Sequence, residues 1–481
     1  GNRRLFAAFY RLAKGARERN ISITYKEEHF MLEKMFKLKE NNTSFRTEVV
    51  AGLTTFMAMA YILAVNPNIL SATGMNSDAI LLATALASFV GCMAMALLAN
   101  YPFALAPGMG LNAYMAFTVC GNMGYSWQIA LLAVFVEGLI FIVLSLTNVR
   151  EAIFNAIPMA LKKGVSAGIG LFIAFIGLQG ANLVVNDDST LLTYVKFVGD
   201  FHTIGIGALL ALIGLFIIVV LHHKNIKGSI LIGILATWIL GMICEAIGLY
   251  VPDGKEFYSL YPTFRMIDFG AFGTTFGQCF NVDFSGVDIL NFIAVLFAFL
   301  FVDIFDTLGT LIGVSTKANM LDEEGKLPRI RPALLADAIA TSVGAIFGTS
   351  TTTTYVESSA GVAAGGRTGL SAMVTGLLFL LAIVFAPIFT AIPSFATAPA
   401  LIFVGFLMIS SIISIDFEDI TEAVPAYLAM LAMPLMYSIA EGIAMGVVSY
   451  VVINLLCGKA KKITPLMYVL AVLFICKYIF L

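Results

Sequence analysis

The chain has 481 residues, of which 59% are hydrophobic and only 12% are charged, and its formal net charge is −2. A soluble protein uses charged residues at about 25% of its positions, so this composition excludes a soluble enzyme or binding module. The slightly negative charge excludes the basic surface by which proteins bind nucleic acid.

Residues 1–45 are predicted to be a cytoplasmic N-terminal segment. Residues 1–30 are polar and basic, begin with Gly and contain no apolar signal-peptide core. Met31 then precedes a charged stretch and the first apolar run. The hypothesis is that residues 1–30 are translated leader sequence, and N-terminal sequencing of the native protein tests it.

Long stretches without Lys or Arg predict many membrane spans. None occurs between Arg46 and Arg150 or between Arg367 and Lys459. Each gap has room for several spans of about 20 apolar residues. Hydropathy predicts about fourteen segments, and those that read as continuous helices lie near 48–70, 79–99, 128–146, 164–182, 204–222, 228–250, 289–314, 333–347, 369–391, 396–415, 423–437 and 439–457.

Two further segments, near 102–118 and 349–366, are too broken to be ordinary helices. The first contains Pro107, Gly108 and Gly110, and the second has a run of threonines that favours extended backbone before a glycine-rich stretch. Irregular backbone at membrane depth requires a protein or water-filled surrounding. A pair of interrupted segments in corresponding halves therefore indicates a transporter binding site.

The spacing of these features predicts two repeats. Arg46 and Asp288, which open the two halves, are 242 positions apart, and Asn112 and Glu357 in the broken segments are 245 positions apart. Because each repeat has seven spans, the second must run inverted. The predicted fold is an all-α polytopic membrane protein with repeats at 46–250 and 288–457, an extracellular connection at 251–287 and a C-terminal segment at 458–481.

The distribution of Lys and Arg predicts a cytoplasmic N-terminus. This orientation places Lys162, Lys163, residues 222–227, residues 317–331 and Arg367 inside, and the loops at 183–203 and 251–287 outside. Residues 458–481 comprise a basic loop and an apolar tail. The tail, 464–481, either lies along the membrane or crosses it.

Ionisable side chains at membrane depth are functional candidates because each costs about 2.5–3.5 kcal/mol to insert. Asp303 and Asp306 are three residues apart on one helix face, and Glu357 and Asn112 lie in the two broken segments. Function is favoured for Asp306 and Glu357, and Asp303 either shares it or supports Asp306. Four others are expected to make interhelical hydrogen bonds or to face water: Glu137, Glu245, Asp337 and Glu441.

These residues suit a neutral planar heterocycle. A carboxylate accepts two hydrogen bonds from adjacent N–H groups of such a ring. Phe103, Met109 and Tyr355 are available to sandwich the ring. The run Thr351 to Thr354 either only fills a strand or turns its backbone amides and hydroxyls toward the ligand. A second carboxylate can carry a driving proton. The lack of Lys or Arg argues against an anionic substrate. The six cysteines have no metal-ligand spacing, so no metal or cofactor is expected.

The chain resembles the nucleobase–ascorbate transporter (xanthine/uracil permease) superfamily, most closely its adenine/guanine/hypoxanthine permease branch. The resemblance covers Phe45 to about Lys462 and is carried by TEVVAGLTTFMAMAYILAVNP, FALAPGMGLNAYMAF, FVDIFDTLGTLIGV and TSTTTTYVESSAGVAAGGRTGL. It implies core and gate domains, short antiparallel strands in the third and tenth spans, a homodimer and elevator-like motion.

The resemblance also assigns residues. Asp306 matches the acidic residue of span eight, Glu357 that of span ten, and Asn112 the asparagine of span three. Many relatives have His four residues after the span-eight acid, where this chain has Thr310. The expected substrate-binding residues are Asn112, Met109, Asp306, Thr310, Thr354, Tyr355 and Glu357. Asp303, Asp306 and Glu357 are the expected proton-coupling residues.

The expected function is proton-coupled import of purine bases through the cell membrane. The alternatives are a permease for another neutral base such as uracil or xanthine, and an anion carrier of the same fold. A channel would need a continuous polar pore, and no HExxH or nucleophile–His arrangement points to an enzyme.

Overall fold

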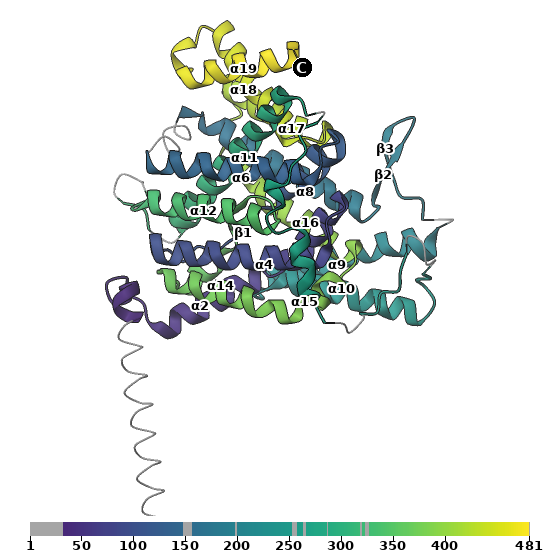
Figure 1. Cartoon of the computed structure of the whole chain (residues 1–481). Coiled ribbons are helices and arrows are strands. Elements are labelled where there is room, and N and C mark those ends of the chain that lie inside the picture. The colour runs from purple at the N-terminus through teal and green to yellow at the C-terminus, as the bar shows by residue number, and fades with distance from the viewer. Residues whose placement is uncertain are drawn as a thin grey trace, which may run out of the picture.

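The computed structural model describes residues 32–147, 156–197, 200–252, 257–262, 266–285, 287–317, 320–322 and 327–480. The proposed leader, residues 1–30, lies outside the described residues. Within them, 11 helical spans are long and apolar enough to cross a membrane. The protein is therefore a mostly helical, polytopic membrane protein, as predicted (Figure 1).

The spans are formed by helices α2 (Phe45–Met59), α3 (Ile62–Leu70), α4 (Ser77–Ala94), α6 (Trp127–Leu146), α8 (Met159–Gly180), α9 (Ile206–His223), α10 (Ser229–Ala246), α11 (Ile289–Lys317), α12 (Ile330–Phe347), α14 (Gly369–Ala382), α15 (Ala386–Thr390), α16 (Ser394–Ile409) and α18 (Ile439–Leu456), with adjoining turns. Two shorter apolar helices are α17 (Ile420–Leu435) and α19 (Pro465–Phe480). Several begin at side-chain caps: Ser44 accepts from the Thr47 N–H, and Asn76 accepts from the Asp78 and Ala79 N–H groups.

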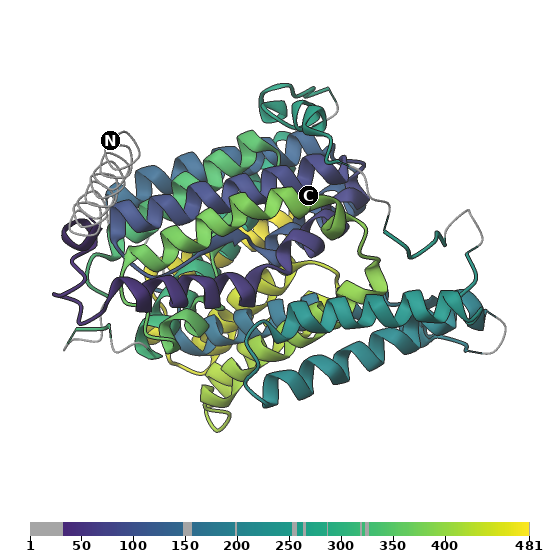
Figure 2. The ribbon, with the colours of Figure 1, turned by 90° about the horizontal axis from the view of Figure 1, so that it is seen from below.

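The helices pack as two groups. In the first group, α2, α3, α4, α6, α11, α12 and α14 contact one another, and in the second, α8, α9, α10, α16, α17 and α18 do so. In Figure 2, the teal helices α9 and α10 of the second group lie side by side along one flank of the molecule. α11 and the short α5 (Met109–Ala113) both reach across to contact α8.

The two broken segments meet as a pair of short strands. β1 (Leu105–Pro107) pairs antiparallel with β4 (Thr352–Thr354), with Ala106 opposite Thr353. Pro107 cannot continue a helix, so backbone groups on either side need other partners. The Gly108 N–H donates to the Thr351 carbonyl at 2.9 Å and the Tyr355 N–H to the Ala104 carbonyl at 2.9 Å. β1 and β4 are called the strand pair below.

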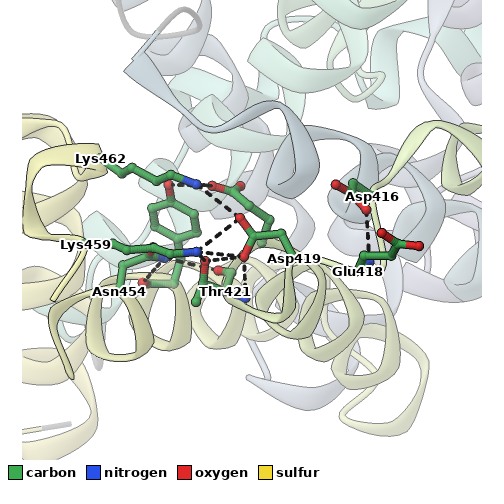
Figure 3. A network of polar contacts seen from close by, with 9 residues as sticks. Asp416, Glu418, Asp419, Thr421, Asn454, Lys459 and Lys462 are labelled. Carbon is green, nitrogen blue, oxygen red and sulfur yellow. Dashed lines mark hydrogen bonds and ion pairs between the residues drawn. The ribbon is translucent and has the colours of Figure 1, made fainter. Parts of the chain in front are cut away.

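A charged network fixes the N-terminal end of α17 (Figure 3). Asp419 caps α17 and accepts hydrogen bonds from Thr421, from Lys459 Nζ at 3.0 Å and from Lys462 Nζ at 3.1 Å. These contacts hold the pKa of the Asp419 carboxyl well below its usual range. The network joins α17 to the loop between α18 and α19.

Candidate functional site

The strand pair is held in place by side chains from several helices. Cys92 on α4 bonds the backbone of Leu105, and the Ala104 N–H donates to Ser358 Oγ at 3.0 Å. Thr341 on α12 donates to the Thr352 carbonyl at 3.0 Å. These contacts satisfy backbone groups that would otherwise be unpaired at membrane depth. The strand pair is therefore hydrogen-bonded to the elements around it.

Asp306 on α11 lies beside Gly108, the residue that follows β1. Its Oδ2 lies 3.5 Å from the point that a Cβ on Gly108 would occupy. The side chain is partly buried, and no hydrogen bond joins its carboxylate to another described residue. The charged groups that act on it electrostatically are Asp337 and Glu357, both acidic. Asp306 thus offers an acceptor to a ligand with N–H groups.

Glu357 stands between β4 and α13 (Ser358–Ala363) and is also partly buried. The hydroxyl of Tyr61 donates to its Oε1 at 2.6 Å. Asp306 and Glu357 are close enough to interact electrostatically. The structure therefore brings together the two carboxylates predicted from the sequence to bind substrate.

Asp303 belongs to a fully buried cluster around Thr307, the residue that follows Asp306. The hydroxyl of Thr307 lies 2.9 Å from Asp303 Oδ1, 2.9 Å from Asp337 Oδ1 and 2.7 Å from Thr353 Oγ1. Asp303 and Asp337 both have 0% exposure. Thr307 thereby ties α11, α12 and β4 together, which gives Asp303 a supporting position and confirms an interhelical hydrogen bond for Asp337.

Asn112 is fully buried at the C-terminal side of β1, where its Oδ1 accepts a hydrogen bond from Ser350 Oγ. Its Nδ2 has no hydrogen-bond partner among the described residues, and neither has Thr354 Oγ1. Buried polar atoms nearly always have a partner. Asn112 thus places an unpaired amide donor beside the strand pair, inside the protein.

Replacing Asn112 with Ala is expected to weaken substrate binding and to change which bases compete. Loss of one hydrogen bond in a site of this kind costs about 0.5–1.5 kcal/mol, or roughly two- to tenfold in affinity. Competition by unlabelled bases against labelled substrate measures the change. An unchanged affinity and competition order would remove Asn112 from the site.

The other predicted contact residues have mixed positions. Met109 is buried at the start of α5, and Thr310 is partly buried one turn after Asp306. Tyr355 uses its hydroxyl to donate to the Pro107 carbonyl at 2.6 Å, so it locks the two broken segments together. Phe103 is fully buried and stacks on Tyr101 with ring centroids 5.2 Å apart, so it packs in the core rather than presenting a free ring face.

Three further acidic residues were expected to make interhelical hydrogen bonds or to face water. Of these, Glu441 bonds a residue of another helix, while Glu137 and Glu245 bond residues outside helices. Glu137 on α6 accepts from Thr351 Oγ1 at 2.7 Å. Glu245, in the last turn of α10, accepts from Ser259 Oγ and from the Leu260 N–H, both at 2.7 Å. Glu441, in the first turn of α18, accepts from the Tyr478 hydroxyl. Each carboxylate joins two segments of the chain.

Sequence reasoning missed Tyr61, Thr307 and Glu48. Glu48 has 0% exposure and accepts from the Arg367 N–H at 2.8 Å and from Ser371 Oγ at 2.5 Å, which fastens α2 to the start of α14. The position of Thr307 one residue after Asp306 was a usable signal. The contact of Tyr61 with Glu357 joins positions 296 apart, and no local pattern reveals it.

Gly108 makes the close approach between the strand pair and Asp306 possible. A Cβ there would lie 2.6 Å from Thr353 Cγ2. Gly108→Ala is therefore expected to reduce uptake about fivefold or more, because overpacking costs about 1–3 kcal/mol. Gly180→Ala, whose Cβ would meet no atom within 4 Å, is the control and should transport normally. Equal uptake by both variants would contradict the tight packing at the site.

Comparison with known proteins assigns the family. A protein-family model described as "Permease family" matches residues 46–445 of the sequence. The chain belongs to this permease family. Within it, the permease falls in the adenine/guanine/hypoxanthine branch of the nucleobase–ascorbate transporter superfamily. It is accordingly a membrane transporter and not an enzyme.

Curated relatives match over nearly their full lengths. The permease is 46% identical to the guanine/hypoxanthine permease PbuG of Bacillus subtilis, covering 94% of this chain and 100% of that protein. It is 42% identical to the adenine permease AdeP of Escherichia coli, covering 94% and 96%. A putative permease of Methanocaldococcus jannaschii is 46% identical, covering 94% and 98%.

Solved structures show the same fold at lower identity. The transmembrane domain of the cyanobacterial bicarbonate transporter BicA aligns with a TM-score of 0.60 at 17% identity, covering 83% of this permease and 97% of that chain. SLC26A9 aligns with a TM-score of 0.54 at 11% identity, covering 85% and 65%. These similarities concern the fold alone.

Proposed function

We propose that this permease imports the purine bases hypoxanthine, guanine and adenine by proton symport across the cell membrane. The relatives named guanine/hypoxanthine and adenine permeases support the substrate class. The observation that carries the proposal is the position of Asp306 and Glu357, two partly buried carboxylates beside the strand pair. The charged groups that act on Asp306 are acidic.

The chemistry of such a site favours a neutral ligand rich in N–H groups. One carboxylate accepts from adjacent N–H groups of the base, and the unpaired amide of Asn112 donates to a ring nitrogen or carbonyl. Met109, Thr310, Thr354 and Tyr355 complete the proposed surroundings. The second carboxylate binds the driving proton, because two nearby carboxylates in a site of low polarity resist double ionisation. We assign proton coupling to Asp306 and Glu357, supported by Asp303.

The proposed architecture has fourteen spans in two inverted repeats, 46–250 and 288–457. In this scheme the first helix group is the core domain and the second is the gate domain, with the strand pair formed by spans three and ten. The contacts of α5 and α11 with α8 support a site at the boundary of the two groups. Elevator-like movement of the core, a cytoplasmic N-terminus and a homodimer in the lipid membrane complete the proposal.

Proton coupling is tested with purified permease in proteoliposomes. An imposed inward proton gradient is expected to concentrate labelled hypoxanthine without Na⁺, and a protonophore is expected to abolish that accumulation. Hypoxanthine addition is also expected to acidify the lumen. Accumulation driven by a Na⁺ gradient and unaffected by the protonophore would contradict proton symport.

The alternatives differ in substrate. A uracil or xanthine permease would show uptake of those bases and no competition by hypoxanthine, guanine or adenine. An anion carrier of the same fold would need a cation or helix N-termini at the substrate, whereas the groups acting on Asp306 are acidic. Competition by neutral purines but not by bicarbonate distinguishes a purine permease from an anion carrier.

A further inference from the structure

The first span is interrupted beside the candidate site. α2 ends at Met59, α3 begins at Ile62, and Ala60 and Tyr61 form a turn between them. The Leu63 and Ala64 N–H groups donate three residues back, to Ala60 and Tyr61, so the helix tightens at this point. Tightened turns within a helix often mark a functional hinge.

Tyr61 places its side chain in the protein interior at this turn. Its exposed fraction is 0%, and its hydroxyl donates to Glu357 Oε1 at 2.6 Å. A short hydrogen bond to a carboxylate is among the stronger kinds in proteins. Among the described residues, no second side chain donates to this carboxylate.

The main chain around Glu357 is already fixed without Tyr61. The Tyr355 N–H and hydroxyl bond the backbone of the first broken segment, and Ser358 Oγ accepts from the Ala104 N–H. What remains free is the glutamate side chain, which loses considerable rotamer freedom when it is ordered. Tyr61 removes that freedom by holding Oε1 of the carboxylate.

We propose that Tyr61 is a positioning residue, which orients the Glu357 carboxylate toward substrate and couples occupancy of the site to the break in the first span. This inference rests on the proposed function, since it takes Glu357 as a substrate ligand. It adds a residue from the first span to a site otherwise formed by the third, eighth and tenth spans of the proposed architecture.

The test compares Tyr61→Phe with Tyr450→Phe. Tyr450 is also buried, with 2% exposure, and its hydroxyl also donates to a glutamate, Glu422, at 3.2 Å, in the first turn of α17. For Tyr61→Phe we expect KM for hypoxanthine to rise about tenfold or more, with maximal rate largely kept, because hydrogen bonds to charged groups contribute that much or more. Tyr450→Phe should keep the wild-type KM.

A second readout does not depend on knowing the substrate. Each variant in native membranes is treated with dicyclohexylcarbodiimide, which modifies carboxyl groups in apolar surroundings, and modification of Glu357 is measured by mass spectrometry. We expect it to rise several-fold in Tyr61→Phe and to match the wild type in Tyr450→Phe. This result stands even if the wild type transports no purine base, which would overturn only the proposed function.

Two outcomes would overturn the positioning role. One is unchanged KM together with unchanged modification of Glu357. The other is a normal KM for Tyr61→Phe together with a thermal unfolding midpoint in detergent well below that of Tyr450→Phe. Tyr61 would then be a structural residue only.

Discussion

Replacing Asp306 with Asn is expected to abolish purine uptake while the permease still accumulates in the membrane. The amide presents a donor to the N–H groups of the substrate where the carboxylate presented two acceptors. Two hydrogen bonds to a charged group contribute roughly 3–6 kcal/mol, so uptake should fall at least about 100-fold. The measurement is initial uptake rate normalised to permease in the membrane.

A matched control separates this effect from a general loss of negative charge. Asp187 lies outside the spans in the hairpin of β2 (Val184–Asp187) and β3 (Leu191–Tyr194). Hydrogen bonds from Ser189 and Thr190 lower the pKa of its carboxyl to about 2. Asp187→Asn should transport normally. Wild-type uptake by Asp306→Asn would remove Asp306 from the site.

Replacing Glu357 with Gln is expected to have an effect of similar size. Gln fills the same space, but it carries no charge and cannot take up or release a proton, so it cannot complete a proton-coupled cycle. The Tyr61 hydroxyl would then donate to a neutral amide, a weaker partner than a carboxylate. We therefore expect no accumulation of base against its gradient.

The control for this variant is Glu245→Gln. Glu245 lies in the last turn of α10 and accepts hydrogen bonds from Ser259 and Leu260. Both proteins should be present at equal amounts and should elute as folded species from a sizing column. If Glu357→Gln accumulated hypoxanthine as well as Glu245→Gln did, the assignment of Glu357 would be wrong.

Much of the fold could be predicted because membrane insertion leaves a strong local signal. Apolar runs free of Lys and Arg predicted the helical spans, and Pro107 with its neighbouring glycines predicted irregular backbone in the first broken segment. The residues Asp306 and Glu357 were recognisable for the same reason, since charge is rare at membrane depth.

The remaining features depend on contacts between distant positions. Neither the interruption of the first span at Ala60 and Tyr61 nor the bond from Tyr61 to Glu357 follows from composition or periodicity. The role of Thr307 between Asp303 and Asp337 arises only when α11 and α12 pack together. Such side chains look like ordinary helix residues until their partners are known.

The central claim is that this chain carries purine bases, and it is tested most directly by uptake of radiolabelled hypoxanthine in cells that lack their own purine permeases. Cells with empty vector are the baseline, and Asp306→Asn expressed to the same amount is the inactive reference. We predict saturable uptake above both, inhibited by unlabelled guanine or adenine and greater at acidic than at alkaline pH. Uptake by the wild-type permease no greater than that of Asp306→Asn, for every base tested, would contradict the account.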